Sequence, residues 1–220
     1  MNKKMLVTAT LIALIVGFAV ATNWYRGAEA ERVETIADES TNVLVPGHAM
    51  SLGPEDAQVV LVEFFDPACE TCAMFHKPVK DLLKQYPERL RLVLRYAPFH
   101  HGSEDVAKML EAARLQGKYW EALEVMFATQ RRWASHHHPQ PELLWELLPA
   151  AGLELDMERM RQDFAGFQID SIVQKDIADA ATLGIRKTPG FLVNGRQLPS
   201  FGLAQLHQLV AEEMAAKYTK

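Results

Sequence analysis

The chain has 220 residues, of which 49% are hydrophobic, and its formal net charge is −5 at pH 7. A chain of this size can bury a substantial core as one domain, with room for an inserted subdomain. The acidic balance argues against a nucleic-acid partner, since no basic patch interleaved with aromatic residues is present. Two cysteines cannot complete a four-ligand zinc site, and the chain has no second C-x-x-C motif.

Residues 1–25 are predicted to be an export segment. Lys3 and Lys4 precede an uncharged, mostly apolar stretch at residues 5–22. In one interpretation this stretch is a signal peptide, cleaved after the small residues at 19–21 or 28–30. In the other it is an uncleaved inner-membrane anchor, long enough to span a bilayer and followed by interfacial aromatic residues. Both interpretations predict a periplasmic protein, either released or tethered to the inner membrane.

Residues 26–56 are polar, mixed in charge and broken by proline and glycine, and we interpret them as a tether. Within this tether, Val43-Leu44-Val45 is expected to add a short edge strand. Residues 57–220 are expected to form one domain.

The two cysteines lie together as Cys69-Glu70-Thr71-Cys72, shortly after an apolar run at residues 59–65. That run does not alternate, as expected for a strand buried on both faces. A strand followed by C-x-x-C at the start of a helix, here predicted over residues 72–86, is typical of thiol–disulfide redox proteins. The spacing allows a disulfide, and the helix N-terminus lowers the pKa of the first thiol. The alternative is a small structural disulfide, which would restrain only a short loop.

Residues 90–96 alternate leucines and a tyrosine with arginines and a valine, which predicts a second strand and completes a β-α-β unit. Residues 103–183 are predicted to be almost entirely helical. Two short strands at 190–193 and 196–198 then flank Asn194-Gly195, which favours a hairpin with a type I′ turn, and a last helix covers residues 203–217. The element order predicts an α/β protein, a thioredoxin fold with an inserted helical subdomain at about 103–183.

Together, the strand before C-x-x-C, the helical insert and the pattern G-x-x-x-T-P-x-x-x-x-N-G at residues 184–195 resemble the DsbA-like family of exported thiol–disulfide oxidoreductases. The resemblance runs from residue 59 to the C-terminus. It implies an enzyme that exchanges disulfides with exported proteins and a membrane-bound redox partner. Cys69 would be the nucleophile, and Cys72 would resolve the mixed disulfide. Glu70-Thr71 departs from the proline and histidine of the strongly oxidising members, so we expect a less extreme oxidant.

Glu63 is the only charged residue in its apolar strand. In one interpretation it is a strand-end carboxyl that reaches water. In the other it is a buried carboxyl with a raised pKa beneath the C-x-x-C motif, and it passes a proton to or from Cys72. The resemblance favours the second interpretation, because the family places an acid at a similar point.

Thr188 and Pro189 precede the predicted hairpin. The resemblance implies a cis proline facing the cysteines, with the backbone of Thr188 available to an extended substrate. The alternative is a plain trans proline in a turn.

The run His136-His137-His138 lies in a loop rich in proline, where a solvated linker competes with a metal site. We assign no metal and no cofactor. His100 and His101 are candidates for the rim of the active site, against a role confined to their loop. The competing function is a non-catalytic peptide-binding chaperone or a metal-handling module on the same fold. The oxidase, reductase and isomerase directions are all compatible with the motif.

Overall fold

The computed structural model describes residues 43–134 and 138–218. The chain divides into two compact units between Pro46 and Gly47. The export segment lies outside the described residues, so the signal peptide and the anchor both stay predictions. Within the described ranges, no helix has the length and apolarity needed to cross a membrane.

The edge strand expected at residues 43–45 is wrong, because Val43 and Leu44 are helical. The strand at that edge of the sheet instead lies in the second unit, where Met50–Leu52 forms β1 and pairs with β3 (Leu90–Tyr96). A run of apolar residues next to Pro46 satisfies a helical turn as well as a strand, so three residues were too few to decide.

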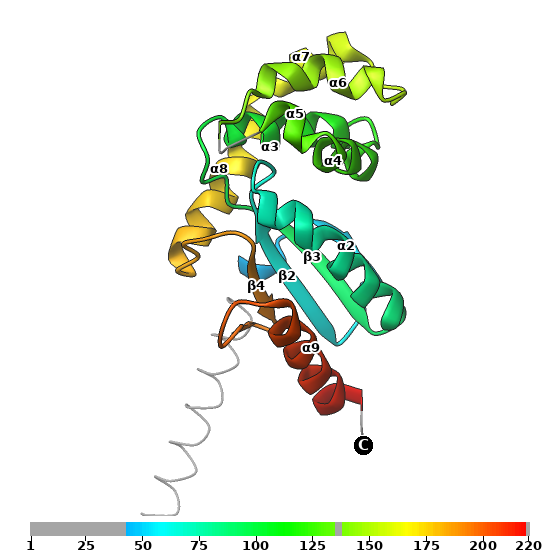
Figure 1. Ribbon diagram of the computed structural model, residues 1–220, viewed down its shortest axis with the longest axis vertical. Coiled ribbons are helices and arrows are strands. Elements are labelled where there is room, and N and C mark those ends of the chain that lie inside the picture. The colour runs from blue at the N-terminus through cyan, green and yellow to red at the C-terminus, as the bar shows by residue number, and fades with distance from the viewer. Residues whose placement is uncertain (1–42, 135–137, 219–220) are drawn as a thin grey trace, which may run out of the picture. The chain divides into compact units, whose positions relative to one another are not determined.

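A five-stranded sheet in the order β1-β3-β2-β4-β5 forms the centre of the second unit (Figure 1). β2 and β3 run parallel, and every other neighbouring pair is antiparallel. Helix α2 makes the crossover between the two parallel strands, as parallel pairing requires. The remaining strands and the crossover helix are β2 (Val59–Phe65), β4 (Gly190–Val193), β5 (Arg196–Gln197) and α2 (Glu70–Gln85).

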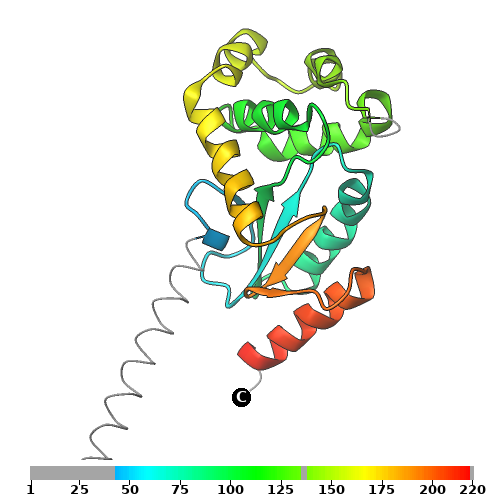
Figure 2. The ribbon, with the colours of Figure 1, turned by 90° about the vertical axis from the view of Figure 1, so that its left-hand side faces the viewer.

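Helices cover both faces of this sheet. α2 and α9 (Leu203–Tyr218) lie on one face, and α8 (Phe167–Thr182) lies on the other (Figure 2). The other helices gather beyond the ends of β2 and β3 (Figure 1). They are α3 (Ser103–Arg114), α4 (Tyr119–Ala128), α5 (Gln130–Trp133), the 3-10 turn η2 (Pro141–Leu143), α6 (Leu144–Ala150) and α7 (Met157–Phe164). The predicted insertion is therefore helical from α3 to α8.

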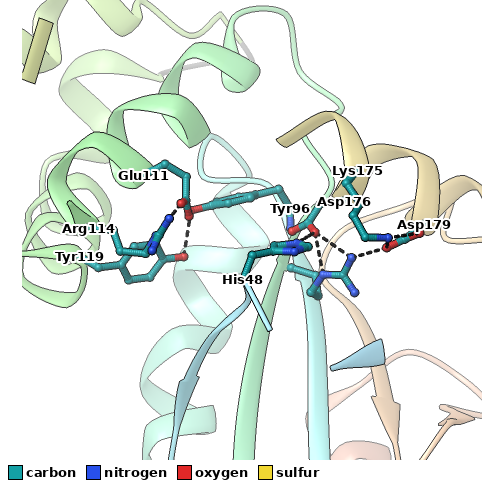
Figure 3. Close-up of polar contacts among 9 residues, drawn as sticks. His48, Tyr96, Glu111, Arg114, Tyr119, Lys175, Asp176 and Asp179 are labelled. Carbon is teal, nitrogen blue, oxygen red and sulfur yellow. Dashed lines mark hydrogen bonds and ion pairs between the residues drawn. The ribbon is translucent and has the colours of Figure 1, made fainter. Parts of the chain in front are cut away.

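Arg95 of β3 is buried, although the local sequence pattern predicts an exposed side chain at this position. Alternating leucine and arginine is typical of a strand with one polar face, but Arg95 is fully buried. Its Nε donates to Asp176 Oδ1 (2.8 Å) and its Nη2 donates to Asp179 Oδ2 (2.6 Å). Asp176 also accepts the backbone N–H of Tyr96 (2.8 Å) and contacts His48 Nε2 (2.7 Å) (Figure 3). α8 therefore docks on the sheet through a buried cluster of charges.

The predicted hairpin is confirmed. Asn194 and Gly195 have φ angles of 48° and 80°, the left-handed values that a type I′ turn needs. Asn194 also anchors the hairpin to β2, since its N–H donates to Val60 O and its Oδ1 accepts the N–H of Val60, both at 2.9 Å. This anchoring fixes β4 beside β2 and so fixes the position of the residues that precede β4.

Candidate active site

The C-x-x-C motif lies where β2 ends and α2 begins. Cys69 is the N-cap residue of α2, with φ −75° and ψ 119°, and its carbonyl accepts the N–H of Ala73 (3.2 Å). Cys72 follows in the first turn. Cys69 is 8% exposed and Cys72 is fully buried, so the first cysteine is the more accessible one, although it is not broadly exposed. Both thiols are free.

The surroundings drive the two thiol pKa values apart. A hydrogen bond from Cys72 lowers the pKa of Cys69 to about 5, helped by Thr188 and by the backbone of Thr71 and Cys72, and opposed by burial. Burial raises the pKa of Cys72 well above its ordinary value, and its hydrogen bond to Cys69 and the charge of Glu63 act in the same direction. At neutral pH the pair therefore holds one thiolate, on Cys69, and one thiol, on Cys72.

Alkylation of the reduced protein should report this asymmetry. We expect the rate of Cys69 modification by iodoacetamide to rise through a midpoint near pH 5 and to be flat above about pH 6. Cys72→Ala removes the chief donor to the thiolate and should move the midpoint to higher pH. Cys72→Ser keeps an O–H donor and should give an intermediate midpoint. A wild-type midpoint near pH 9 would contradict the assigned thiolate.

Thr188, which precedes Pro189, lies against Cys69. The Thr188–Pro189 peptide bond is cis, and Pro189 is buried. Cys69 Sγ lies 3.4 Å from the carbonyl oxygen of Thr188, to which the neutral thiol donates. These two positions are 119 residues apart in the sequence, and the pairing of β2 with β4 brings them together in one site.

Glu63 lies beneath α2. The strand register places it beside Leu94 of β3 and Phe191 of β4, so the three side chains share one face of the sheet. α2 covers that face, because Phe75 stacks on Phe191 with ring centroids 5.5 Å apart. Glu63 is 5% exposed, which rules out the interpretation of a strand-end carboxyl that reaches water. Burial raises its pKa to about 8, with a smaller contribution from Cys69.

Two further residues hold the active-site turn, and no local sequence pattern indicates either role. The buried carboxylate of Asp66 accepts the N–H of Ala68 (2.8 Å) on Oδ1 and the N–H of His100 (2.9 Å) on Oδ2. Gln130, on α5 of the insert, donates from Nε2 to Pro67 O (3.0 Å) and to Cys69 O (3.1 Å). The helical insert thus contacts the backbone of the motif itself, which only the folded chain reveals.

The histidine candidates fall into two groups. His100 Nδ1 lies 2.7 Å from Asp66 Oδ2, so this ring belongs to the network that holds the active-site turn. His136 and His137 lie outside the described residues, and His138 is exposed. Over residues 43–134 and 138–218, no group of three or more histidine, cysteine or acidic side chains is arranged to hold a metal ion.

Comparison with known proteins agrees with this architecture. A protein-family model described as thioredoxin matches residues 46–212. A thioredoxin-like oxidoreductase from Silicibacter pomeroyi DSS-3 is 27% identical, with a TM-score of 0.66 over 78% of this chain and 95% of that chain. BdbD from Bacillus subtilis is 22% identical, with a TM-score of 0.64 over 74% of this chain and 91% of that chain. The oxidoreductase DsbA from Xylella fastidiosa is 22% identical, with a TM-score of 0.60. The predicted thioredoxin fold and the resemblance to DsbA-like proteins are confirmed at the level of the fold.

The curated proteins that match this chain are much longer than the chain, and the match covers only a part of each. The Na(+)/H(+) antiporter NhaA of Herminiimonas arsenicoxydans is 36% identical over 146 residues, which cover 66% of this chain but 22% of the antiporter. The antiporter NhaA 3 of Salinispora tropica is 31% identical over 148 residues, or 21% of its length. The chain thus spans about a fifth of the curated relatives that it matches.

Proposed function

The chain belongs to the thioredoxin family, and on that premise we propose that it is a thiol–disulfide oxidoreductase that acts on exported proteins through Cys69 and Cys72. One observation carries the proposal. The pKa of Cys69 is lowered to about 5 while that of Cys72 is raised, so one sulfur is a stable leaving group and the other holds its proton. A structural disulfide has no need of that asymmetry, whereas disulfide exchange depends on it.

The first step starts from the protein with a Cys69–Cys72 disulfide. A substrate thiolate attacks Sγ of Cys69. A bond forms between the substrate sulfur and Cys69 Sγ, and the disulfide bond between Cys69 and Cys72 breaks. Cys72 leaves with the electron pair and takes up a proton, because its surroundings favour the neutral thiol. Glu63 is the proposed donor, since a carboxyl with a pKa of about 8 still carries its proton at neutral pH.

The second step releases the product. Another thiolate of the substrate attacks the substrate sulfur of the mixed disulfide, and Cys69 leaves as a thiolate. The substrate is thereby oxidised by two electrons, and the protein is left with one thiolate and one thiol. A leaving thiol of low pKa speeds this step, so the acidity of Cys69 serves it directly.

The backbone of Thr188 is the proposed guide for the substrate. Its carbonyl lies 3.4 Å from Cys69 Sγ, and an extended peptide that reaches this sulfur passes alongside it. The residue after it, Pro189, has no N–H that could donate a hydrogen bond to the sulfurs. Main-chain pairing of this kind holds a substrate without selecting its sequence.

The site of action is proposed from the N-terminus of the chain. Two lysines and the apolar residues 5–22 support export to the periplasm, with or without an inner-membrane anchor. An oxidising compartment is where protein disulfides persist. A membrane-bound redox partner would return the protein to its disulfide form after each cycle.

We expect the protein to be an oxidant of intermediate strength. A stabilised thiolate favours the reduced protein, and so the oxidation of its substrate. The pKa of Cys69, about 5, lies between about 3.5 for a strong oxidant and about 7 for thioredoxin. This agrees with the departure of Glu70-Thr71 from the strongly oxidising members.

The decisive experiment equilibrates the protein with mixtures of reduced and oxidised glutathione and counts free thiols after an acid quench. An insulin-reduction assay is run beside it. We expect a single two-electron transition, together with turnover of insulin. A pair that stays in one redox state across all mixtures and leaves insulin intact would contradict the proposed activity and favour the binding module.

Glu63→Gln should slow exchange by about a hundredfold near neutral pH, because the amide keeps the shape of the carboxyl but has no proton to give. In the wild type the rate should also fall above about pH 8, where Glu63 ionises, and the variant should lack this step. Glu70→Gln is the matched control, since it removes an exposed carboxyl next to Cys69. Identical pH profiles for Glu63→Gln and the wild type would remove Glu63 from the mechanism.

Stability gives a second measure of Glu63 that is independent of activity. Folded Glu63 keeps its proton up to about pH 8, whereas in the unfolded chain it loses the proton near pH 4.5. The folded state binds more protons within that window, so Glu63 lowers the free energy of unfolding as the pH rises through it. In the oxidised protein, where the cysteines do not titrate, Glu63→Gln should therefore gain stability over the wild type as the pH rises from 5 to 8.

A further inference from the structure

A cavity lies immediately beside the proposed active site. It has a volume of about 300 Å³ and is lined by residues 184–187, 189–191 and 197–201. Pro189 belongs to its wall, and the carbonyl of the preceding residue is 3.4 Å from Cys69 Sγ. A peptide joined to Cys69 therefore needs only one or two residues, at about 3.3–3.6 Å each, to reach this cavity.

The inner wall of the cavity is apolar and aromatic. Phe201 is 43% exposed, and its ring stacks on Phe75 of α2 with centroids 5.1 Å apart. Phe75 in turn stacks on the buried Phe191. These contacts tie the cavity to the helix that carries both cysteines, and the exposed part of the Phe201 ring is accessible to an incoming side chain.

The rim of the cavity is cationic. Arg186 and Lys187 are exposed, and Lys187 Nζ lies 5.7 Å from the centre of the Phe201 ring. Among the described residues that line the cavity, none is an aspartate or a glutamate. Within the described ranges, neither cation forms an ion pair with a carboxylate.

These two cations without an ion pair lie together on the rim of the cavity, on a protein that is acidic overall. Many other surface cations of the described residues lie within 4 Å of a carboxylate of the same chain, as Lys77, Lys84, Lys108 and Lys175 do. A positive rim without its own counter-charge attracts an anionic partner and speeds its association. The apolar wall beside the rim suits a short apolar side chain.

We propose that this cavity selects substrates in which the reacting cysteine is followed or preceded, within two residues, by an aspartate or glutamate next to an apolar residue. The carboxylate binds at Arg186 and Lys187, and the apolar side chain packs on Phe201. The proposal rests on the proposed disulfide exchange and names the substrate class of the same site.

The test measures how fast the full chain, in its disulfide form, reacts with three reduced peptides. They carry Cys-Glu-Leu, Cys-Gln-Leu or Cys-Lys-Leu in an otherwise identical uncharged sequence. Each rate constant is divided by the rate at which the same peptide reduces bis(2-hydroxyethyl) disulfide, a neutral reference. This division removes the effect of the neighbouring charge on the peptide thiol itself.

We expect the normalised rate for the glutamate peptide to exceed that for the lysine peptide by about tenfold at low ionic strength, and by less in 0.5 M NaCl. Arg186→Gln combined with Lys187→Gln should bring the ratio close to one. Lys77→Gln combined with Lys84→Gln removes the same charge from exposed positions on α2 and should leave the ratio unchanged.

The results that would overturn this inference differ from the result that would overturn the proposed function. Exchange with all three peptides at equal normalised rates, or a ratio that the Arg186 and Lys187 changes do not alter, overturns the inference and leaves the proposed function standing. Dimerisation or binding to anionic vesicles that needs Arg186 and Lys187, with equal peptide rates, assigns the cavity to another occupant and also overturns it. No exchange with any peptide overturns the proposed function, and the inference with it.

Discussion

Cys69→Ser is expected to abolish disulfide exchange, with a loss of at least about a thousandfold. Only the sulfur of Cys69 combines access to solvent with a position at the helix N-terminus and a pKa near 5. A serine hydroxyl at that position is not ionised at neutral pH and cannot form a mixed disulfide. The measurement is insulin reduction together with oxidation of a dithiol peptide.

Cys72→Ser is expected to give the complementary result. Cys69 can still form a mixed disulfide with a substrate, but the variant has no second sulfur that could resolve this mixed disulfide. Mixed disulfides between the variant and its substrates should therefore accumulate and appear as bands that dithiothreitol removes. If Cys72→Ser lost all reactivity while Cys69→Ser accumulated mixed disulfides, the two roles would have to be exchanged.

Arg95→Leu is expected to lower the free energy of unfolding by about 3–5 kcal/mol. The guanidinium is fully buried and donates to two carboxylates of α8, at 2.8 Å to Asp176 and at 2.6 Å to Asp179. Asp176 is itself only 1% exposed. Removing the cation leaves this carboxylate buried with His48 and one backbone N–H as its remaining partners. Denaturant unfolding of the oxidised protein measures the loss.

The matched control lies on the same strand. Arg91 contacts the hydroxyl of Ser51 (3.1 Å) and a backbone carbonyl, both of which are uncharged. Arg91→Leu should therefore cost about 1 kcal/mol. Adding Asp176→Asn to Arg95→Leu should recover part of the loss, because the amide carries no charge into the core. Equal losses for the two arginine variants would show that the buried cluster contributes nothing beyond ordinary hydrogen bonds.

The local pattern of the chain was enough to predict the path of the core elements. The unbroken apolar run of β2, the C-x-x-C spacing and Asn194-Gly195 each specify their structure within a few neighbouring residues. Strand burial, the first turn of a helix and a type I′ turn depend on short-range sterics and on hydrogen bonds between near neighbours. For the same reason, the candidate pair Cys69 and Cys72 was evident from the sequence.

Only the tertiary structure decided which distant residues meet at these elements. The burial of Arg95 depends on two aspartates 81 and 84 residues further along the chain, and the support of the active-site turn depends on Gln130 from the insert. The segment that carries Arg186 and Lys187 comes beside Cys69 only when β4 pairs with β2. The sequence by itself determined the elements and the reactive pair, because those follow from local geometry. The surroundings that set the pKa values, and the place of the cavity beside Cys69, depend on contacts between segments far apart in the chain, which no local pattern records.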